Sequence, residues 1–271
     1  MILAPKAPKM GLFSFIRRLL TQRRIAIHTI SRAKGCGQIM YFEQYGSGAP
    51  VVYLHGWGCD GSIFLPIVKQ LPNYANYTVD FAGFGRSNPP PDCGWTVADY
   101  AEALKQFLSE QGLTRVTLVG HSFGCRVALV LAANYPELVN RMLFVAPAGL
   151  RKFSLARWWK VRSYKLSKRI ARLRNKQPVI KYASQDYVNC SPAMRATFVK
   201  VINQDLSRYA KRVKCPVLIV NGREDAATPL THAKRLNKLM ANSQLVEIDG
   251  DHFAFFYAPV AFANTVKNFV E

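Results

Sequence analysis

The chain has 271 residues, of which 49% are apolar, so it is long enough to bury a large core and is not an intrinsically disordered protein. No apolar run reaches the roughly 18 residues that a membrane-spanning helix needs. The six cysteines lack Cys-x-x-Cys spacing, which argues against a zinc cluster. Without a recognisable signal peptide, reduced thiols in a cytoplasmic protein are the simplest expectation.

The net charge of +21 is concentrated in two segments. Residues 1–35 carry eight basic residues and no acidic one, while residues 150–214 carry 18 basic and two acidic residues. The rest of the chain is slightly acidic, with 11 basic and 14 acidic residues. This shift in composition predicts a basic N-terminal arm (1–35), a core (36–149 and 215–271) and an inserted block (150–214).

In chain order, short apolar runs typical of strands alternate with longer segments typical of helices. Strands are predicted over 25–30, 39–45, 51–54, 77–81, 115–119, 141–147, 216–220 and 244–248, and helices over 62–71, 97–111, from 125 onward, 231–240 and 259–270. This alternation predicts an α/β fold with a mostly parallel central sheet flanked by helices. Functional residues are then expected on the loops that follow the strands.

A serine enclosed by glycines separates one of these strands from the next helix. Gly120, Ser122 and Gly124 form a G-x-S-x-G pattern, which is typical of a tight strand-to-helix turn that exposes the serine hydroxyl. Backbone N–H groups at the start of the following helix are suited to stabilising a developing anion. The alternative is an ordinary turn, since glycine and serine are common in loops.

A nucleophilic serine needs a base and a group that orients the base. Of the five histidines, His252 is the one on a downstream loop directly after a predicted strand. Asp225 follows the strand before it, so it is the first candidate for the orienting acid. Glu224 and Asp251 remain alternatives to Asp225, because each lies beside one of these residues.

Five segments in this order resemble the α/β-hydrolase superfamily, in its cap-bearing, serine esterase-like branch. They are HGWG (55–58), DFAGFGRS (80–87), GHSFG (120–124), GREDAATP (222–229) and DHFAFF (251–256), and the resemblance runs from about residue 36 to the end. It implies that Ser122 is the nucleophile, Asp225 the triad acid and His252 the general base. It also implies an oxyanion hole formed by the backbone N–H groups of Trp57 and Phe123, and no cofactor or metal.

The chain departs from the family pattern at three positions. Cys125 stands where a glycine is usual, and we expect it to be a small buried helix residue. Ala82 replaces the proline of the family's D-x-P-G turn. Asp251 precedes His252, where a small residue is commoner, and a carboxylate near the imidazole would raise the pKa of the histidine.

The resemblance places a helical cap over the substrate pocket, and the block 150–214 is the candidate for it. His55, Trp158 and Trp159 are the residues predicted to line the pocket. His55 and His121 are also expected to organise loops through hydrogen bonds and not to act as bases. Residues 191–209 are predicted to form a helix. The basic face of the cap is either simply solvated, or attracts anionic substrates, or docks on an anionic surface.

The N-terminal arm carries an amphipathic pattern. On one helical face lie Leu12, Phe13, Phe15, Ile16, Leu19 and Leu20, opposite basic and polar residues. Such a helix suits peripheral contact with an anionic membrane, although it can equally pack on the core or mediate a dimer. The sequence does not fix the oligomeric state.

The sequence therefore predicts a serine hydrolase that cleaves small-molecule carboxylic esters through an acyl-enzyme. Dehalogenases and epoxide hydrolases of this fold carry a carboxylate at the position of Ser122, so both are disfavoured. C–C bond hydrolases, lactonases and amidases share the triad and remain alternatives. A non-enzymatic binder of anionic surfaces is a further alternative. Nucleic acid is not an expected partner, because no nucleic-acid-binding motif is present.

Overall fold

The computed structural model describes residues 29–33, 38–90, 94–151, 162–163 and 185–271. The predicted amphipathic helix of the arm lies outside the described residues. Trp158 and Trp159 also lie outside them, as does most of the first half of the predicted cap.

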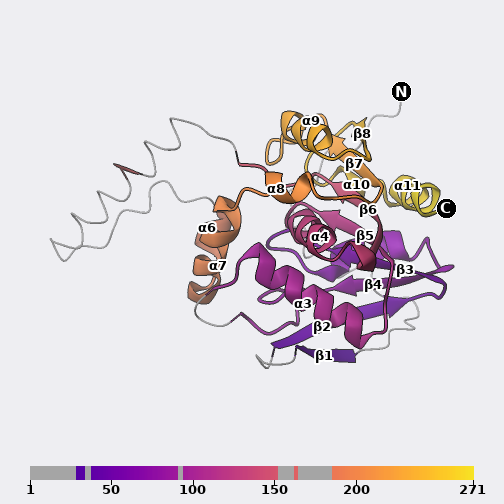
Figure 1. Cartoon of the computed structure of the whole chain (residues 1–271), viewed down its shortest axis with the longest axis horizontal. Coiled ribbons are helices and arrows are strands. Elements are labelled where there is room, and N and C mark those ends of the chain that lie inside the picture. Colours follow the sequence, from indigo (N-terminus) through magenta and orange to yellow (C-terminus); the bar gives the residue numbers. More distant parts are fainter. Residues whose placement is uncertain (1–28, 34–37, 91–93, 152–161, 164–184) are drawn as a thin grey trace.

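A single eight-stranded sheet, with strand order β1-β2-β4-β3-β5-β6-β7-β8, organises the described chain (Figure 1). β1 pairs antiparallel with β2, β2 pairs antiparallel with β4, and every later pairing is parallel. The strands are β1 (Thr29–Ala33), β2 (Gln38–Tyr45), β3 (Ala49–Leu54), β4 (Tyr74–Val79), β5 (Val116–His121), β6 (Val139–Val145), β7 (Val217–Gly222) and β8 (Ser243–Ile248). The prediction of an α/β fold with a mostly parallel sheet is confirmed.

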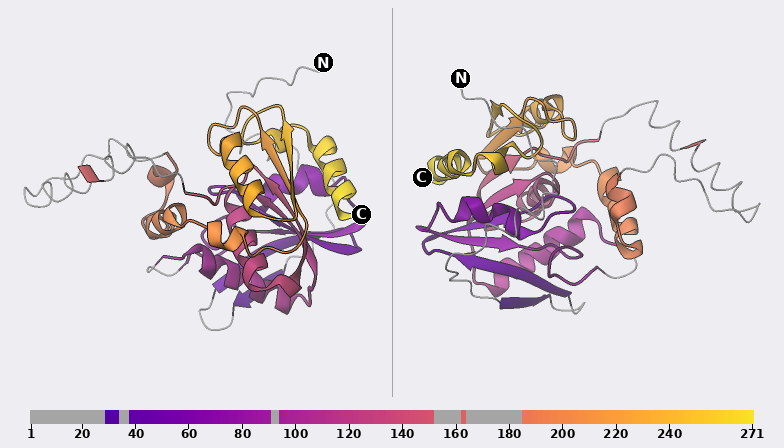
Figure 2. Two further views of the ribbon diagram at one scale, coloured as in Figure 1. Left: turned by 45° about the horizontal axis from the view of Figure 1, so that its top comes forward. Right: turned by 180° about the vertical axis from the view of Figure 1, so that it is seen from behind.

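Helices cover both faces of the sheet. They are η1 (Gly61–Phe64), α2 (Leu65–Val68), α3 (Val97–Glu110), α4 (Phe123–Asn134), η2 (Pro136–Leu138), α6 (Gln185–Asn189), α7 (Pro192–Asn203), α8 (Ser207–Ala210), α9 (Leu230–Leu239), α10 (Ala254–Tyr257) and α11 (Pro259–Val270). Helices α3, α4 and α9 bury their apolar residues in one core cluster, and α2, α10 and α11 in a second. Figure 2 shows α9 and α11 on opposite sides of β7 and β8. No helix among the described residues has the length and apolar content needed to cross a membrane.

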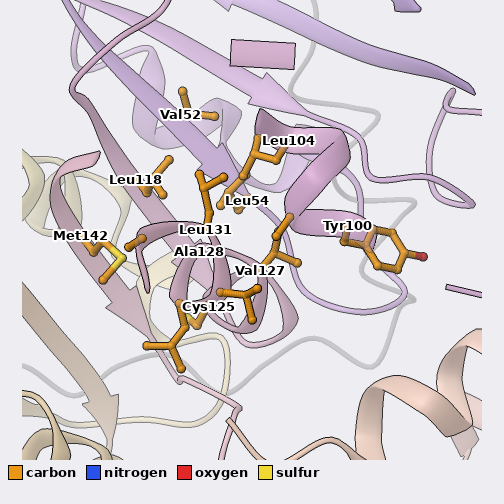
Figure 3. Packing of buried hydrophobic residues seen from close by; sticks show 14 of the residues in the cluster. Val52, Leu54, Tyr100, Leu104, Leu118, Cys125, Val127, Ala128, Leu131 and Met142 are labelled. Carbon is orange, nitrogen blue, oxygen red and sulfur yellow. The ribbon is translucent and has the colours of Figure 1, made fainter. Parts of the chain in front are cut away.

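Helix α4 is the centre of the first core. Every residue from Phe123 to Ala133 is buried. Figure 3 shows side chains of α4, among them Val127 and Leu131, packed near residues of β3, β5 and α3. A helix whose residues are apolar on nearly all sides, here with Arg126 as the one charged residue, is stable only inside a core. Its N-terminus, which directly follows Ser122, is therefore held firmly against the sheet.

Several predicted elements differ from the structure in their limits. The first strand, predicted over 25–30, is β1 at Thr29–Ala33, and residues 25–28 lie outside the described residues. The helix predicted over 191–209 is divided into α7 and α8, because Asp205 accepts the backbone N–H of Ser207 at 2.9 Å and that of Arg151 at 2.7 Å. The helix predicted over 62–71 is the short pair η1 and α2, with Pro66 in the first turn of α2. The strand predicted over 77–81 ends at Val79, so Asp80 falls in the following loop.

Helix α7 lies within the block predicted to be the cap and is tied to the core by buried hydrogen bonds. The guanidinium of Arg126, on α4, donates to the carbonyls of Val201 and Gln204 at 3.0 and 3.1 Å. The Thr197 hydroxyl accepts the N–H of Trp95 at 2.9 Å. These bonds satisfy carbonyls at the end of α7 and fix the helix relative to α4. The division of the chain into core and cap stays a prediction.

Candidate active site

Ser122 forms the turn between β5 and α4 in a backbone conformation that few residues adopt. With φ of 48° and ψ of −101°, it is one of three non-glycine residues with positive φ in the described part of the chain. Its N–H donates to the carbonyl of Val145 at 3.0 Å, and its carbonyl accepts the N–H of Ala148 at 3.3 Å. Strand β6 and the loop after it therefore brace both sides of a strained turn.

The glycines around Ser122 occupy positions where a side chain would collide with backbone atoms. A Cβ atom on Gly124 would lie 2.0 Å from the carbonyl oxygen of Leu54 on β3. A Cβ atom on Gly120 would lie 2.9 Å from the backbone nitrogen of Cys125. The G-x-S-x-G pattern is thus what allows α4 to begin directly against the sheet.

His252 and Asp225 meet behind this turn. Asp225 follows β7 and its side chain is fully buried, while His252 follows β8 and its side chain is 17% exposed. Nδ1 of His252 lies 2.8 Å from Oδ2 of Asp225, which fixes the proton on Nδ1 and leaves Nε2 as the basic nitrogen. Burial opposes ionisation of Asp225, but hydrogen bonds from His252 and Thr228 lower its pKa below the ordinary value.

The two alternative acids do not share this geometry. Asp251 is exposed, and its Oδ1 accepts the backbone N–H of Phe253 at 2.8 Å at the start of a helical turn. Glu224 is also exposed. Of these three carboxylates, that of Asp225 is the one hydrogen-bonded to the imidazole of His252.

Thr228 is a site residue that the sequence analysis missed. Its backbone N–H donates to Oδ1 of Asp225 at 2.8 Å, and its hydroxyl lies 2.8 Å from Oδ2. The N–H of Ala227 also donates to Oδ1, at 2.9 Å. An aspartate followed two and three residues later by donors is a local turn pattern, and the Asp-x-x-Thr spacing was the available signal.

His121 brings His252 to the serine turn. Its ring centroid lies 4.8 Å from that of His252, and its Nε2 lies 3.1 Å from the carbonyl oxygen of His252. Because His121 directly precedes Ser122, this contact connects the histidine loop to the turn. Neither the Ser122 hydroxyl nor Nε2 of His252 has a hydrogen bond within the described residues. The hydrogen bond between a nucleophile and its general base is often long or poorly aligned until substrate is bound.

The segment HGWG passes beside Ser122 on its other side. A Cβ atom on Gly56 would lie 3.5 Å from Cβ of Ser122 and 2.7 Å from Nδ1 of His121, so backbone alone fits there. The N–H groups of Trp57 and Phe123 donate to no other group in the described part of the chain. Two free amide donors next to the serine are what an oxyanion hole requires.

His55 lies behind the site, which corrects the prediction that it lines the substrate pocket. The side chain has no exposed surface, and its ring packs against Phe81 and Phe84. Its Nδ1 donates to the carbonyl of Gly56 at 2.7 Å, and its Nε2 accepts the N–H of Phe81 at 3.0 Å. Burial lowers the pKa of His55 to about 4, so it stays neutral and joins the two loops.

Cys125 is buried at the start of α4, as expected. Its thiol donates to the carbonyl of Gly120 at 3.0 Å, and burial raises its pKa far above the ordinary range. A thiol that stays protonated is a poor nucleophile. Ser122 is therefore the candidate nucleophile at this turn.

The described part of the site is mostly aromatic. The Trp57 ring lies 4.9 Å from that of Phe84, 5.4 Å from that of Phe123 and 5.1 Å from that of Phe198 on α7. Among the described residues no group of three or more histidines, cysteines or carboxylates is arranged to hold a metal ion.

Comparison with known protein families identifies the family of the chain. The family described as "alpha/beta hydrolase fold" matches residues 49–189, which is more than half of the chain. The chain belongs to the α/β-hydrolase family. A second profile, described as "TAP-like protein", matches residues 179–270.

Relatives of the chain are named for different substrates. The chain is 28% identical over 227 residues to a 2-hydroxy-6-oxo-2,4-heptadienoate hydrolase of Pseudomonas putida, covering 74% of this chain and 80% of the relative. It is 25% identical over 256 residues to a pimeloyl-[acyl-carrier protein] methyl ester esterase of Vibrio vulnificus, covering 85% and 97%. An esterase structure from Exiguobacterium antarcticum matches with a TM-score of 0.73 at 23% identity, over 90% of this chain and 99% of that one. This structural likeness shows the shared fold.

We expect Gly124→Ala to destabilise the protein by about 3 kcal/mol or more, because its Cβ would meet a backbone carbonyl that cannot move aside. Thermal unfolding measures the effect. Gly112→Ala is the control, since it also adds a methyl group but meets nothing within 4 Å and carries only the cost of its positive φ. Equal stability losses for the two variants would show that Gly124 is not required by packing.

We expect Asp225→Asn to lower turnover of an activated ester by about 10³–10⁴-fold, because His252 loses both its tautomer restraint and its counter-charge. Asp251→Asn is the matched control and should retain most of the activity. The assignment of the acid is wrong if the loss at Asp251 is the larger one.

Proposed function

We propose that the chain is a serine hydrolase that cleaves carboxylic esters through an acyl-enzyme, with Ser122, His252 and Asp225 as its triad. The observation that carries the proposal is the buried 2.8 Å hydrogen bond between Asp225 and Nδ1 of His252. The strained serine turn beside it adds support. An orienting acid, a base with a free nitrogen and a partly exposed serine at a tight turn are the three parts that such a nucleophile needs.

The proposed reaction begins as Nε2 of His252 takes the hydroxyl proton while Oγ of Ser122 bonds to the ester carbonyl carbon. The oxyanion that forms accepts hydrogen bonds from the N–H groups of Trp57 and Phe123. The C–O bond to the alcohol then breaks, and His252 returns the proton to the departing oxygen. Water, deprotonated by His252, then attacks the acyl carbon. The bond from this carbon to Oγ of Ser122 breaks and His252 returns the proton to Oγ, which releases the acid and restores the serine hydroxyl.

A small-molecule carboxylic ester is the first substrate class in this proposal. The relative from Vibrio vulnificus is named as a methyl ester esterase, and the aromatic rings around Trp57 suit an apolar acyl group. Cleavage of a C–C bond is the second candidate, because the relative from Pseudomonas putida is named as a hydrolase of 2-hydroxy-6-oxo-2,4-heptadienoate. Lactones and amides are further substrates for the same triad.

We also propose that the basic arm brings the enzyme to an anionic membrane surface. Residues 1–35 carry a charge of +8 and a predicted amphipathic helix. Residues 150–214 carry a further +16, which supports attraction to the same kind of surface.

We expect Ser122→Ala to lower hydrolysis of p-nitrophenyl esters by about 10⁵-fold or more and to abolish labelling by a fluorophosphonate, while thermal unfolding stays close to that of the wild type. Ser109→Ala, at an exposed serine of α3, is the control. Near wild-type turnover in Ser122→Ala would remove the mechanism. Assays of a vinylogous diketone, of lactones and of p-nitrophenyl esters with increasing acyl length distinguish C–C bond, lactone and ester hydrolysis. Faster turnover of the diketone would favour C–C cleavage.

We expect the full-length protein to sediment with vesicles that contain phosphatidylserine and to dissociate as salt rises, because exposed charges are screened beyond about 8–10 Å at physiological salt. Arg17→Gln with Arg18→Gln should weaken this binding by about tenfold or more, since each basic residue near the surface contributes about 1 kcal/mol. The control is Lys69→Gln with Lys267→Gln, which removes two exposed charges outside the arm and outside residues 150–214. This control should leave binding nearly unchanged. Binding that does not depend on anionic lipid would refute the membrane proposal.

A further inference from the structure

Thr228 occupies a buried position between the Asp225–His252 pair and the serine turn. It is 8% exposed. Its hydroxyl oxygen lies 2.8 Å from Oδ2 of Asp225, 3.0 Å from the carbonyl oxygen of Ala146 and 3.3 Å from Nδ1 of His252. One side chain thus touches both members of the pair and the loop that follows β6.

The hydrogen bonds of Asp225 show what the hydroxyl adds. Oδ1 is fixed by two backbone donors, the N–H groups of Ala227 and Thr228. Oδ2, the oxygen that receives the imidazole proton, has no backbone donor among the described residues. Its place is set by His252 and by the Thr228 hydroxyl. Without that hydroxyl, Oδ1 of Asp225 would still be held by its two backbone donors, but Oδ2 could move as the carboxylate rotates.

The proton of the hydroxyl has two acceptors within reach. An ionised carboxylate accepts a stronger hydrogen bond than a neutral carbonyl, so Oδ2 of Asp225 is the preferred acceptor over Ala146. The lone pairs of the hydroxyl then face Nδ1–H of His252, which makes a second, longer contact. Thr228 therefore both donates to the acid and accepts from the base.

Ala146 connects this arrangement to the serine turn. It has φ of 47°, and its N–H donates to the carbonyl of Val220 on β7 at 2.9 Å. Its neighbour Val145 accepts the N–H of Ser122. The Thr228 hydroxyl is therefore within hydrogen-bonding distance of the loops after β6, β7 and β8, and the first of these braces the turn after β5.

We propose that the Thr228 hydroxyl is a positioning group that fixes Oδ2 of Asp225, and through it the imidazole of His252, against the loop that braces Ser122. The catalytic consequence of this role rests on the proposed function. The geometric consequence, a His252 Nδ1–H that is protected from exchange with water, does not.

The experiment uses full-length Thr228→Val, which keeps the branched shape and removes the hydroxyl, and Thr228→Ser, which keeps the hydroxyl. The proton NMR signal of His252 Nδ1–H is assigned by its absence in His252→Ala, and its rate of exchange with water is measured. Two other titratable residues lie next to His252: His121, whose ring is tilted by 52° against that of His252, and Asp251, its neighbour in the chain, whose carboxylate accepts the N–H of Phe253. Both are unchanged in these variants.

We expect exchange of this proton to be about tenfold faster or more in Thr228→Val and close to wild type in Thr228→Ser. Ester turnover should show the same order, with kcat about tenfold lower in Thr228→Val and KM little changed, because orientation of the base matters in the transition state. Thr117→Val removes a buried hydroxyl at the opposite end of β5 and serves as the control. Thermal unfolding establishes that each variant is folded, and Thr228→Ala replaces Thr228→Val if the latter is not.

An unchanged exchange rate in folded Thr228→Val would overturn the positioning role, whatever the enzyme hydrolyses. Equal losses in Thr228→Val and Thr228→Ser would overturn it as well, because the hydroxyl would then not be the group that matters. A wild-type protein without esterase activity but with the expected exchange rates would refute the proposed substrate class and leave the positioning of His252 supported.

Discussion

The backbone of Ser122 is the constraint on which the rest of the site depends. A residue at φ of 48° and ψ of −101° costs about 1–3 kcal/mol and persists only where its surroundings leave no alternative. Those surroundings are strand β5, paired on both sides, and helix α4, buried along its length. Because Gly120 and Gly124 have no Cβ atom, β5 and the start of α4 can pack closely against the neighbouring backbone. The stability of the core thus holds the serine in a strained, only partly buried position.

Burial also governs the charges around this turn. Burial of Asp225 opposes its ionisation, yet its pKa is lowered, because its carboxylate accepts hydrogen bonds from His252 and Thr228. Burial of His121 lowers its pKa to about 3, and the neighbouring His252 adds to this effect. Within the described part of the chain, His252 therefore has one ionised hydrogen-bond partner, Asp225, and a neutral neighbour, His121. In a site of low polarity such a pair interacts more strongly than it would in water.

The positions of Ser122, Asp225 and His252 follow from the sequence because each stands directly after an apolar strand, and parallel strands bring such loops to one edge. The contacts that orient them do not follow so directly. The role of Thr228 depends on Ala146, 82 residues away, and the break in the helix predicted over 191–209 depends on Asp205 reaching Arg151. His55 lies in a motif next to the site, but the partners that bury it come from the loop after β4. Local patterns predict elements and loops, whereas these contacts require the packed fold.

The most direct test of this account is a crystal structure of the full-length protein treated with an aryl phosphonate, whose tetrahedral phosphorus imitates the reaction intermediate. We expect a bond from phosphorus to Oγ of Ser122. We also expect a phosphonyl oxygen about 2.7–3.1 Å from the backbone nitrogens of Trp57 and Phe123. Nε2 of His252 should lie within hydrogen-bonding distance of the serine oxygen. An adduct on another residue, or a phosphonyl oxygen that points away from both amides, would contradict the account.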